Sequence, residues 1–153
     1  MTRGERRDIF LDSGAVSALA GDDKLLDGYT HALENDFVGS LHIPSPVQSE
    51  THTGKAQYDA LVHRMVNRLS RPGVEVYLPS SVDIDRRAGE LRFDAEKATG
   101  EKITGIDAQV VAIAEYRSRH RRCAVVILTT DLKHIQALVN ATAAKNIEVD
   151  TPS

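Results

Sequence analysis

The chain has 153 residues, 41% of them hydrophobic, and a formal net charge of −3 at pH 7. This length and apolar content predict one globular domain over residues 1–153, with a core that needs no disulfide. The slight acidity argues against nonspecific nucleic-acid binding driven by overall charge. The single cysteine, Cys123, excludes an internal disulfide and favours a reducing compartment.

The chain carries no signal for export or membrane insertion. Its basic start is followed by an apolar stretch that Asp8 and Asp12 interrupt, unlike a signal peptide. No run approaches the ~20 apolar residues that a membrane span needs. We therefore expect a cytoplasmic protein that does not bind membranes.

The first third of the chain predicts two strands and their helices. Residues 8–12 are apolar at the centre and too short for a helix, so Asp12 ends a strand. After the cap at 22–23, an apolar stripe extends to Phe37. A second strand at 41–43 precedes a helix with Ser45 as N-cap and Pro46 as its first residue. Glu50 lies one turn into this helix.

The middle of the chain predicts three helices and one strand. The apolar stripe at 58–69 indicates a helix that Pro72 and Gly73 stop. Residues 74–78 alternate as a third strand. Residues 79–81 then open a helix that extends to about residue 98, and a loop at 100–105 precedes a helix from 106 to about 119. Asp107 falls in the first turn of that last helix.

The final third supports a parallel sheet. Residues 124–128 are β-branched and free of polar side chains, as expected for a strand covered on both faces. Thr129 and Asp131 follow it, then a helix from 132 to about 144 and a last strand at 147–149. Strands that alternate with helices predict an α/β three-layer sandwich with a mainly parallel central sheet.

Four acidic residues are expected to meet at one edge of this sheet. Asp12 and Asp131 follow strands, while Glu50 and Asp107 lie in the first turns of helices that approach the same edge. Unpaired carboxylates at close range repel one another, so such a cluster normally persists by binding a cation. Singly, each acid is explained as well by helix capping, and only the combination favours a site.

Hard oxygen ligands favour Mg²⁺ or Mn²⁺, with positions left for phosphate oxygens. The chemistry predicted is phosphodiester hydrolysis, in which the metal supplies hydroxide and neutralises charge. Asp12 and Asp107 are the predicted direct ligands, whereas Glu50 and Asp131 bind a second ion or hold waters. The hydroxyls of Thr129 and Ser13 are expected to orient a carboxylate or a water.

Four segments carry a family resemblance: residues 9–15, residues 44–50, residues 105–114, and residues 126–131 with their Thr-x-Asp ending. With these segments the chain resembles PIN-domain nucleases, in particular VapC-type toxins, over nearly its whole length. The resemblance implies a PIN-like fold and an endoribonuclease dependent on Mg²⁺ or Mn²⁺. It places the acidic quartet of the family on Asp12, Glu50, Asp107 and Asp131, and its threonine on Thr129.

The resemblance also implies partners. These are an RNA substrate, a second copy of the chain in a homodimer, and a cognate antitoxin protein that occupies the toxin groove. Any binding to operator DNA would then belong to the antitoxin, since this sequence has no DNA-binding motif of its own.

Other polar clusters are better explained without a ligand. The basic residues from Arg117 to Arg122 suit the carboxyl end of a helix, about 20 Å from Asp107. The six histidines show neither a His-Glu-x-x-His pattern nor cysteine partners, which disfavours zinc. The alternatives that remain are a housekeeping PIN-type RNA-processing nuclease and a noncatalytic PIN-like interaction module. A phosphoryl-accepting Asp12 is disfavoured, because no second aspartate lies two positions after it.

Overall fold

A parallel sheet forms the centre of the protein, a computed structural model of which describes residues 7–35, 38–121 and 123–153. Within these residues the sheet has five strands in the order β3-β2-β1-β4-β5, and every neighbouring pair is parallel. The strands are β1 (Arg7–Leu11), β2 (Ser40–Pro44), β3 (Tyr77–Leu78), β4 (Ala124–Leu128) and β5 (Ile147–Asp150). The α/β class with a parallel sheet is therefore as predicted.

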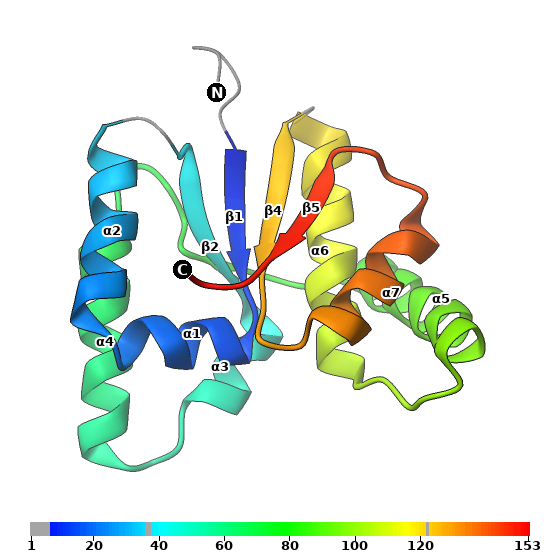
Figure 1. Ribbon diagram of the computed structural model, residues 1–153, viewed down its shortest axis with the longest axis horizontal. Coiled ribbons are helices and arrows are strands. Elements are labelled where there is room, and N and C mark those ends of the chain that lie inside the picture. The colour runs from blue at the N-terminus through cyan, green and yellow to red at the C-terminus, as the bar shows by residue number, and fades with distance from the viewer. Residues whose placement is uncertain (1–6, 36–37, 122) are drawn as a thin grey trace.

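Helices flank the sheet on both sides (Figure 1). The described helices are α1 (Ser13–Ala20), α2 (Asp23–Glu34), α3 (Ser45–Thr51), α4 (Ala56–Leu69), α5 (Val82–Thr99), α6 (Gly105–Arg121) and α7 (Leu132–Thr142). Helices α1 to α4 gather on one side of the view and α5 to α7 on the other. None of the helices in the described part is long and apolar enough to cross a bilayer.

The two central strands determine where the ends of the sheet lie. β1 and β4 are apolar runs, and Phe10, Leu11 and Ile127 are fully buried, as expected for parallel strands covered on both faces. Their register pairs Leu11 with Leu128, so the two strands end at the same level. The residues that follow, Asp12 and Thr129, consequently emerge side by side.

Two local predictions were wrong. Ser45 is the first residue of α3 and not its N-cap, because β2 continues to Pro44 and the chain passes directly from strand to helix. The third strand covers only Tyr77–Leu78 rather than 74–78, since Val74 closes a turn by donating its N–H to the Arg71 carbonyl oxygen at 3.1 Å. As an edge strand, β3 gains partners on one side only.

Three sequence interpretations fall partly outside the described residues: the basic start, the end of the α2 stripe at Phe37, and Arg122 of the basic segment. The rest of the α2 stripe is buried through Leu26 and Leu33. Asp22 caps this helix as expected, with its carboxylate accepting from the Leu25 N–H at 3.0 Å.

Candidate metal centre

Asp12 lies at the carboxyl end of β1 and is nearly inaccessible, with 4% of its surface exposed. It is the N-cap of α1, and its Oδ1 accepts from the Ala15 N–H at 2.8 Å. Its own N–H donates to the Leu128 carbonyl oxygen at 3.2 Å, which extends the β1–β4 pairing. A buried carboxylate is thus fixed at the centre of the sheet edge.

Thr129 connects this carboxylate to the next strand end. Its side chain is fully buried, and its hydroxyl donates to Asp12 Oδ2. The Thr129 hydroxyl oxygen in turn accepts from the Asp131 N–H at 2.8 Å. Thr129 therefore orients Asp12 and holds the backbone of Asp131 at the same time.

The approach of α1 to the β4–α7 connection depends on a glycine. A Cβ at Gly14 would lie 1.9 Å from the Thr130 hydroxyl oxygen and 3.1 Å from the Thr130 Cβ. Rotation of the Thr130 side chain can relieve only the first of these contacts. The absence of a side chain at Gly14 is what lets the two acid-bearing segments approach each other.

Asp107 and Glu50 complete a group of four acids at this edge. Asp107 is half-buried in the first turn of α6, where its N–H donates to the Thr104 hydroxyl at 3.1 Å. Burial, helped by the negative charges of Asp12, Asp131 and Glu50, raises the pKa of Asp107 to about 6. Glu50 is exposed and accepts from the Ser13 hydroxyl at 2.8 Å. The structure thus brings together the four acids that the sequence singled out.

The local environment penalises negative charge at this edge. Burial raises the pKa of Asp12, although the hydrogen bonds from Thr129 and Ala15 act in the opposite direction. A carboxylate oxygen of Asp107, one of Asp131 and a ring nitrogen of His134 lie within 4.8 Å of one another, so the two carboxylates are close enough to share one ion. Oxygen ligands at this spacing, with repulsion that a cation would relieve, fit a hard divalent metal.

His134 joins this group through two carboxylates. Its Nδ1 lies 2.9 Å from Asp131 Oδ2, and its Nε2 lies 2.8 Å from Glu101 Oε2. Both ring nitrogens thus face carboxylate oxygens. The hydrogen bond to Glu101 is the main reason that the pKa of His134 is raised, and the charge of Asp131 adds to it.

Sequence reasoning missed most of this arrangement. Nothing in the sequence indicated Glu101, which comes from a distant loop. Lys133 also binds Glu101, with Nζ 2.7 Å from Oε1. Only the fold brings that loop to the first turn of α7.

Three arginines of the chain pair with acids outside this site. Arg117 lies 3.6 Å from Asp8, near the amino end of β1. Arg64 and Arg68 of α4 pair with Asp23 and Asp27 of α2. Cys123 is half-buried, and burial together with Asp8 raises the pKa of its thiol, as suits a structural residue.

Comparison with known proteins supports the fold. No family model and no curated protein matches this sequence. Among solved structures, a chain of VapBC-1 from nontypeable Haemophilus influenzae is similar, with a TM-score of 0.58 and 14% identity. The match covers 94% of this chain and 97% of that chain. The chain therefore has the same fold over nearly its whole length, and the predicted PIN-like three-layer fold is confirmed.

Proposed function

We propose that this chain is a VapC-type PIN-domain toxin, a cytoplasmic endoribonuclease that requires Mg²⁺ or Mn²⁺. The observation that carries the proposal is the convergence of Asp12, Glu50, Asp107 and Asp131, whose mutual repulsion contributes to raising the pKa of Asp107. The likeness to a chain of the VapBC-1 structure supports it independently. An interaction module would not need four like charges at the carboxyl ends of its strands.

In this proposal Asp12 and Asp107 bind the metal directly, with Asp131 and Glu50 as further ligands or as acceptors for ordered waters. The ion supplies charge neutralisation at the phosphodiester and lowers the pKa of an attacking water. Thr129 holds the Asp12 carboxylate in one orientation by donating to Oδ2, and Ser13 does the same for Glu50. The fixed carboxylates bind and orient the reactants, and no residue of the chain acts as a nucleophile.

The partners follow from the same proposal. A toxin of a VapBC-type pair is a homodimer whose site is covered by a cognate antitoxin, which also supplies any operator-DNA contact. A housekeeping RNA-processing nuclease would share the chemistry and lack the antitoxin. A short reading frame for such a protein directly upstream would distinguish the two.

The test compares the wild-type chain with Asp12→Asn on total RNA in Mg²⁺, Mn²⁺ or EDTA. Asparagine keeps an oxygen that can accept from the Ala15 N–H, and its NH2 group, at the position of Oδ2, can donate to the Thr129 hydroxyl oxygen, so the fold should persist. We expect metal-dependent cleavage that falls by at least about 100-fold in the variant, because even indirect metal contacts are worth 10- to 100-fold. Asp94→Asn, on the exposed side of α5, is the matched control and should cleave like the wild type.

A wild-type chain that neither cleaves RNA nor binds Mg²⁺ by calorimetry would contradict the proposal and favour the noncatalytic module. If Asp12→Asn cleaved RNA as fast as the wild type, the assignment of the metal site to these acids would be contradicted.

A further inference from the structure

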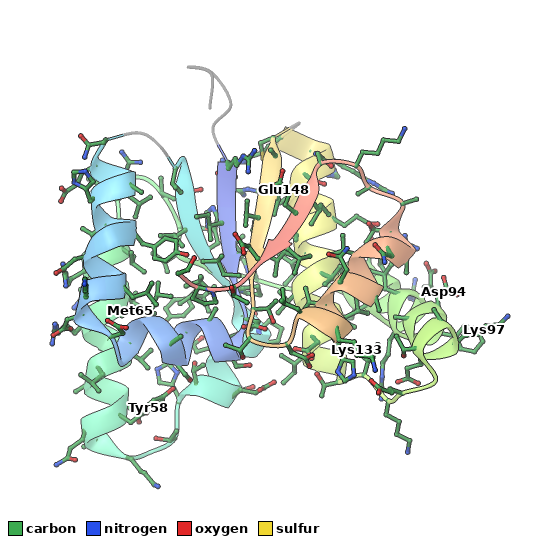
Figure 2. The ribbon with its side chains drawn as sticks, viewed as in Figure 1. Tyr58, Met65, Asp94, Lys97, Lys133 and Glu148 are labelled. Atoms are coloured by element: carbon green, nitrogen blue, oxygen red, sulfur yellow. The ribbon has the colours of Figure 1, made fainter. Side chains whose placement is uncertain are left out.

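Two nitrogen donors, Lys133 and His134, border the carboxylate cluster at the start of α7. Lys133 and His134 hold the two oxygens of the Glu101 carboxylate at 2.7 and 2.8 Å. The Lys133 side chain is 65% exposed and that of Glu101 is 46% exposed, so solvent reaches this contact. Figure 2 shows Lys133 beside the ends of the central strands. The other ring nitrogen of His134 contacts Asp131, which places the pair directly beside the acids.

The geometry of this contact is that of an oxyanion in a two-donor fork. A carboxylate and a phosphodiester both present two oxygens that share a negative charge, so both suit the same pair of N–H donors. In the proposed ribonuclease, the phosphates of an RNA strand bound at the acids are the oxyanions that would come nearest to these donors.

The Glu101 side chain can move away from Lys133 and His134 without disrupting the loop that carries it. Ile103, two residues on, is buried, and its carbonyl oxygen accepts from Arg92 Nε at 2.7 Å. The Ile103 N–H donates to Glu96 Oε1 at 3.1 Å. The loop is thus anchored to α5 independently of Glu101. An exposed ion pair is weak because solvent screens it, so a phosphate can displace this carboxylate at little cost.

We propose that Lys133 and His134 form a phosphate-binding fork for the RNA strand, which Glu101 occupies in the absence of RNA. The fork rests on the proposed ribonuclease function and adds to it a subsite for a phosphate beside the one that is cleaved. Glu101 then acts as an internal competitor of the substrate.

The test measures binding of a short fluorescein-labelled single-stranded RNA of random sequence by fluorescence anisotropy across a KCl series. All variants carry Asp12→Asn, so that RNA remains intact. Adding Lys133→Met should weaken binding and reduce the slope of log Kd against log [KCl] by about 0.7, the value for one single-strand phosphate contact. Adding Glu101→Gln should tighten binding. Lys97→Met, an exposed lysine on α5 that points away from the site (Figure 2), is the matched control and should leave the slope unchanged.

The opposite signs for Lys133→Met and Glu101→Gln separate a fork from a structural clamp. A clamp that merely ties the loop to α7 would make both variants bind RNA more weakly and unfold at lower temperature. Weaker binding and a lower unfolding temperature in both variants would overturn the fork. An unchanged slope in Lys133→Met, or no RNA binding by any variant, would also overturn it. Cleavage is scored separately with the chain that retains Asp12. Absent cleavage with the expected slopes would contradict the nuclease proposal and not the fork.

Discussion

At the scale of single residues, Gly14 is the tightest point of the site. We predict that Gly14→Ala lowers the free energy of unfolding by about 1–3 kcal/mol, the usual cost of an overpacked contact. It should also weaken Mg²⁺ binding, because the shift separates Asp12 from Thr129 and Asp131. Urea unfolding and magnesium calorimetry measure the two effects.

Gly28→Ala is the control for this substitution. Gly28 lies inside α2, and a Cβ there would meet nothing within 4 Å. Alanine at such a helical position should stabilise by about 0.5–1 kcal/mol. Similar losses in the two variants would show that the close approach of Gly14 to Thr130 has no special role.

Residues with a strong sequence context were predictable, and residues that depend on tertiary contacts were not. Asp12, Thr129 and Asp131 follow apolar strands, so the order of elements alone places them at one edge. Glu101 lies in a polar loop without any periodic pattern. Its contact with His134 exists only because that loop returns to α7.

At the scale of elements, an ion pair with a buried glutamate joins α5 to α6, the helix that carries Asp107. Arg87 of α5 donates to both oxygens of Glu115 of α6, at 2.8 and 3.1 Å, and Glu115 is 3% exposed. These hydrogen bonds raise the pKa of Arg87 further above its already high value. Arg87 also binds Glu90 at 2.9 Å, but on the exposed side of α5.

The two glutamates allow a matched comparison. We predict that Glu115→Gln lowers the free energy of unfolding by about 2 kcal/mol, because it removes a charged, bidentate partner from a buried position. Glu90→Gln should cost less than about 1 kcal/mol, as expected for an exposed pair. Thermal and urea unfolding measure both changes, and equal costs would mean that burial of the Glu115 pair adds nothing.

Elements with one dominant local signal were predicted closely, and those set by neighbours were not. The five apolar residues of β4 were located correctly, and the N-caps Asp22 of α2 and Ser81 of α5 fall within the segments predicted to open these helices. The length of β3 depends on how far it can pair with β2, and the start of α3 depends on where β2 ends. The residues of β3 and α3 do not determine these two boundaries by themselves.

At the scale of the whole molecule, the acids make stability depend on pH and metal. The folded-state pKa of Asp107, about 6, exceeds its ordinary value, so the folded chain binds more protons between about pH 4 and 6. In EDTA, the contribution of Asp107 to stability should therefore fall as the pH rises through this window and level off above it. Partial exposure limits this contribution to the order of 1 kcal/mol.

Metal should reverse this loss. At neutral pH, Mg²⁺ at 100 times its Kd should stabilise the chain by about 2.7 kcal/mol, and its affinity should drop below about pH 6 because protons compete for Asp107. Thermal unfolding at several pH values, with Mg²⁺ or EDTA, measures both effects. The Asp107→Asn variant should lose the part of the pH dependence of stability that Asp107 contributes, and Mg²⁺ should stabilise it only weakly. If Mg²⁺ stabilised this variant as much as the wild type, the role of Asp107 would be contradicted.

The strand order also governs when the acidic site can form during synthesis. β1, which leads into Asp12, lies between β2 and β4, and β4 is made more than a hundred residues later. While the ribosome is still adding the residues before β4, the nascent chain lacks the neighbour that orients Asp12, and Asp131 does not yet exist. A translation product that ends before β4 therefore lacks both Thr129 and Asp131, and the acidic site can form only after the segment that follows β4 has been made.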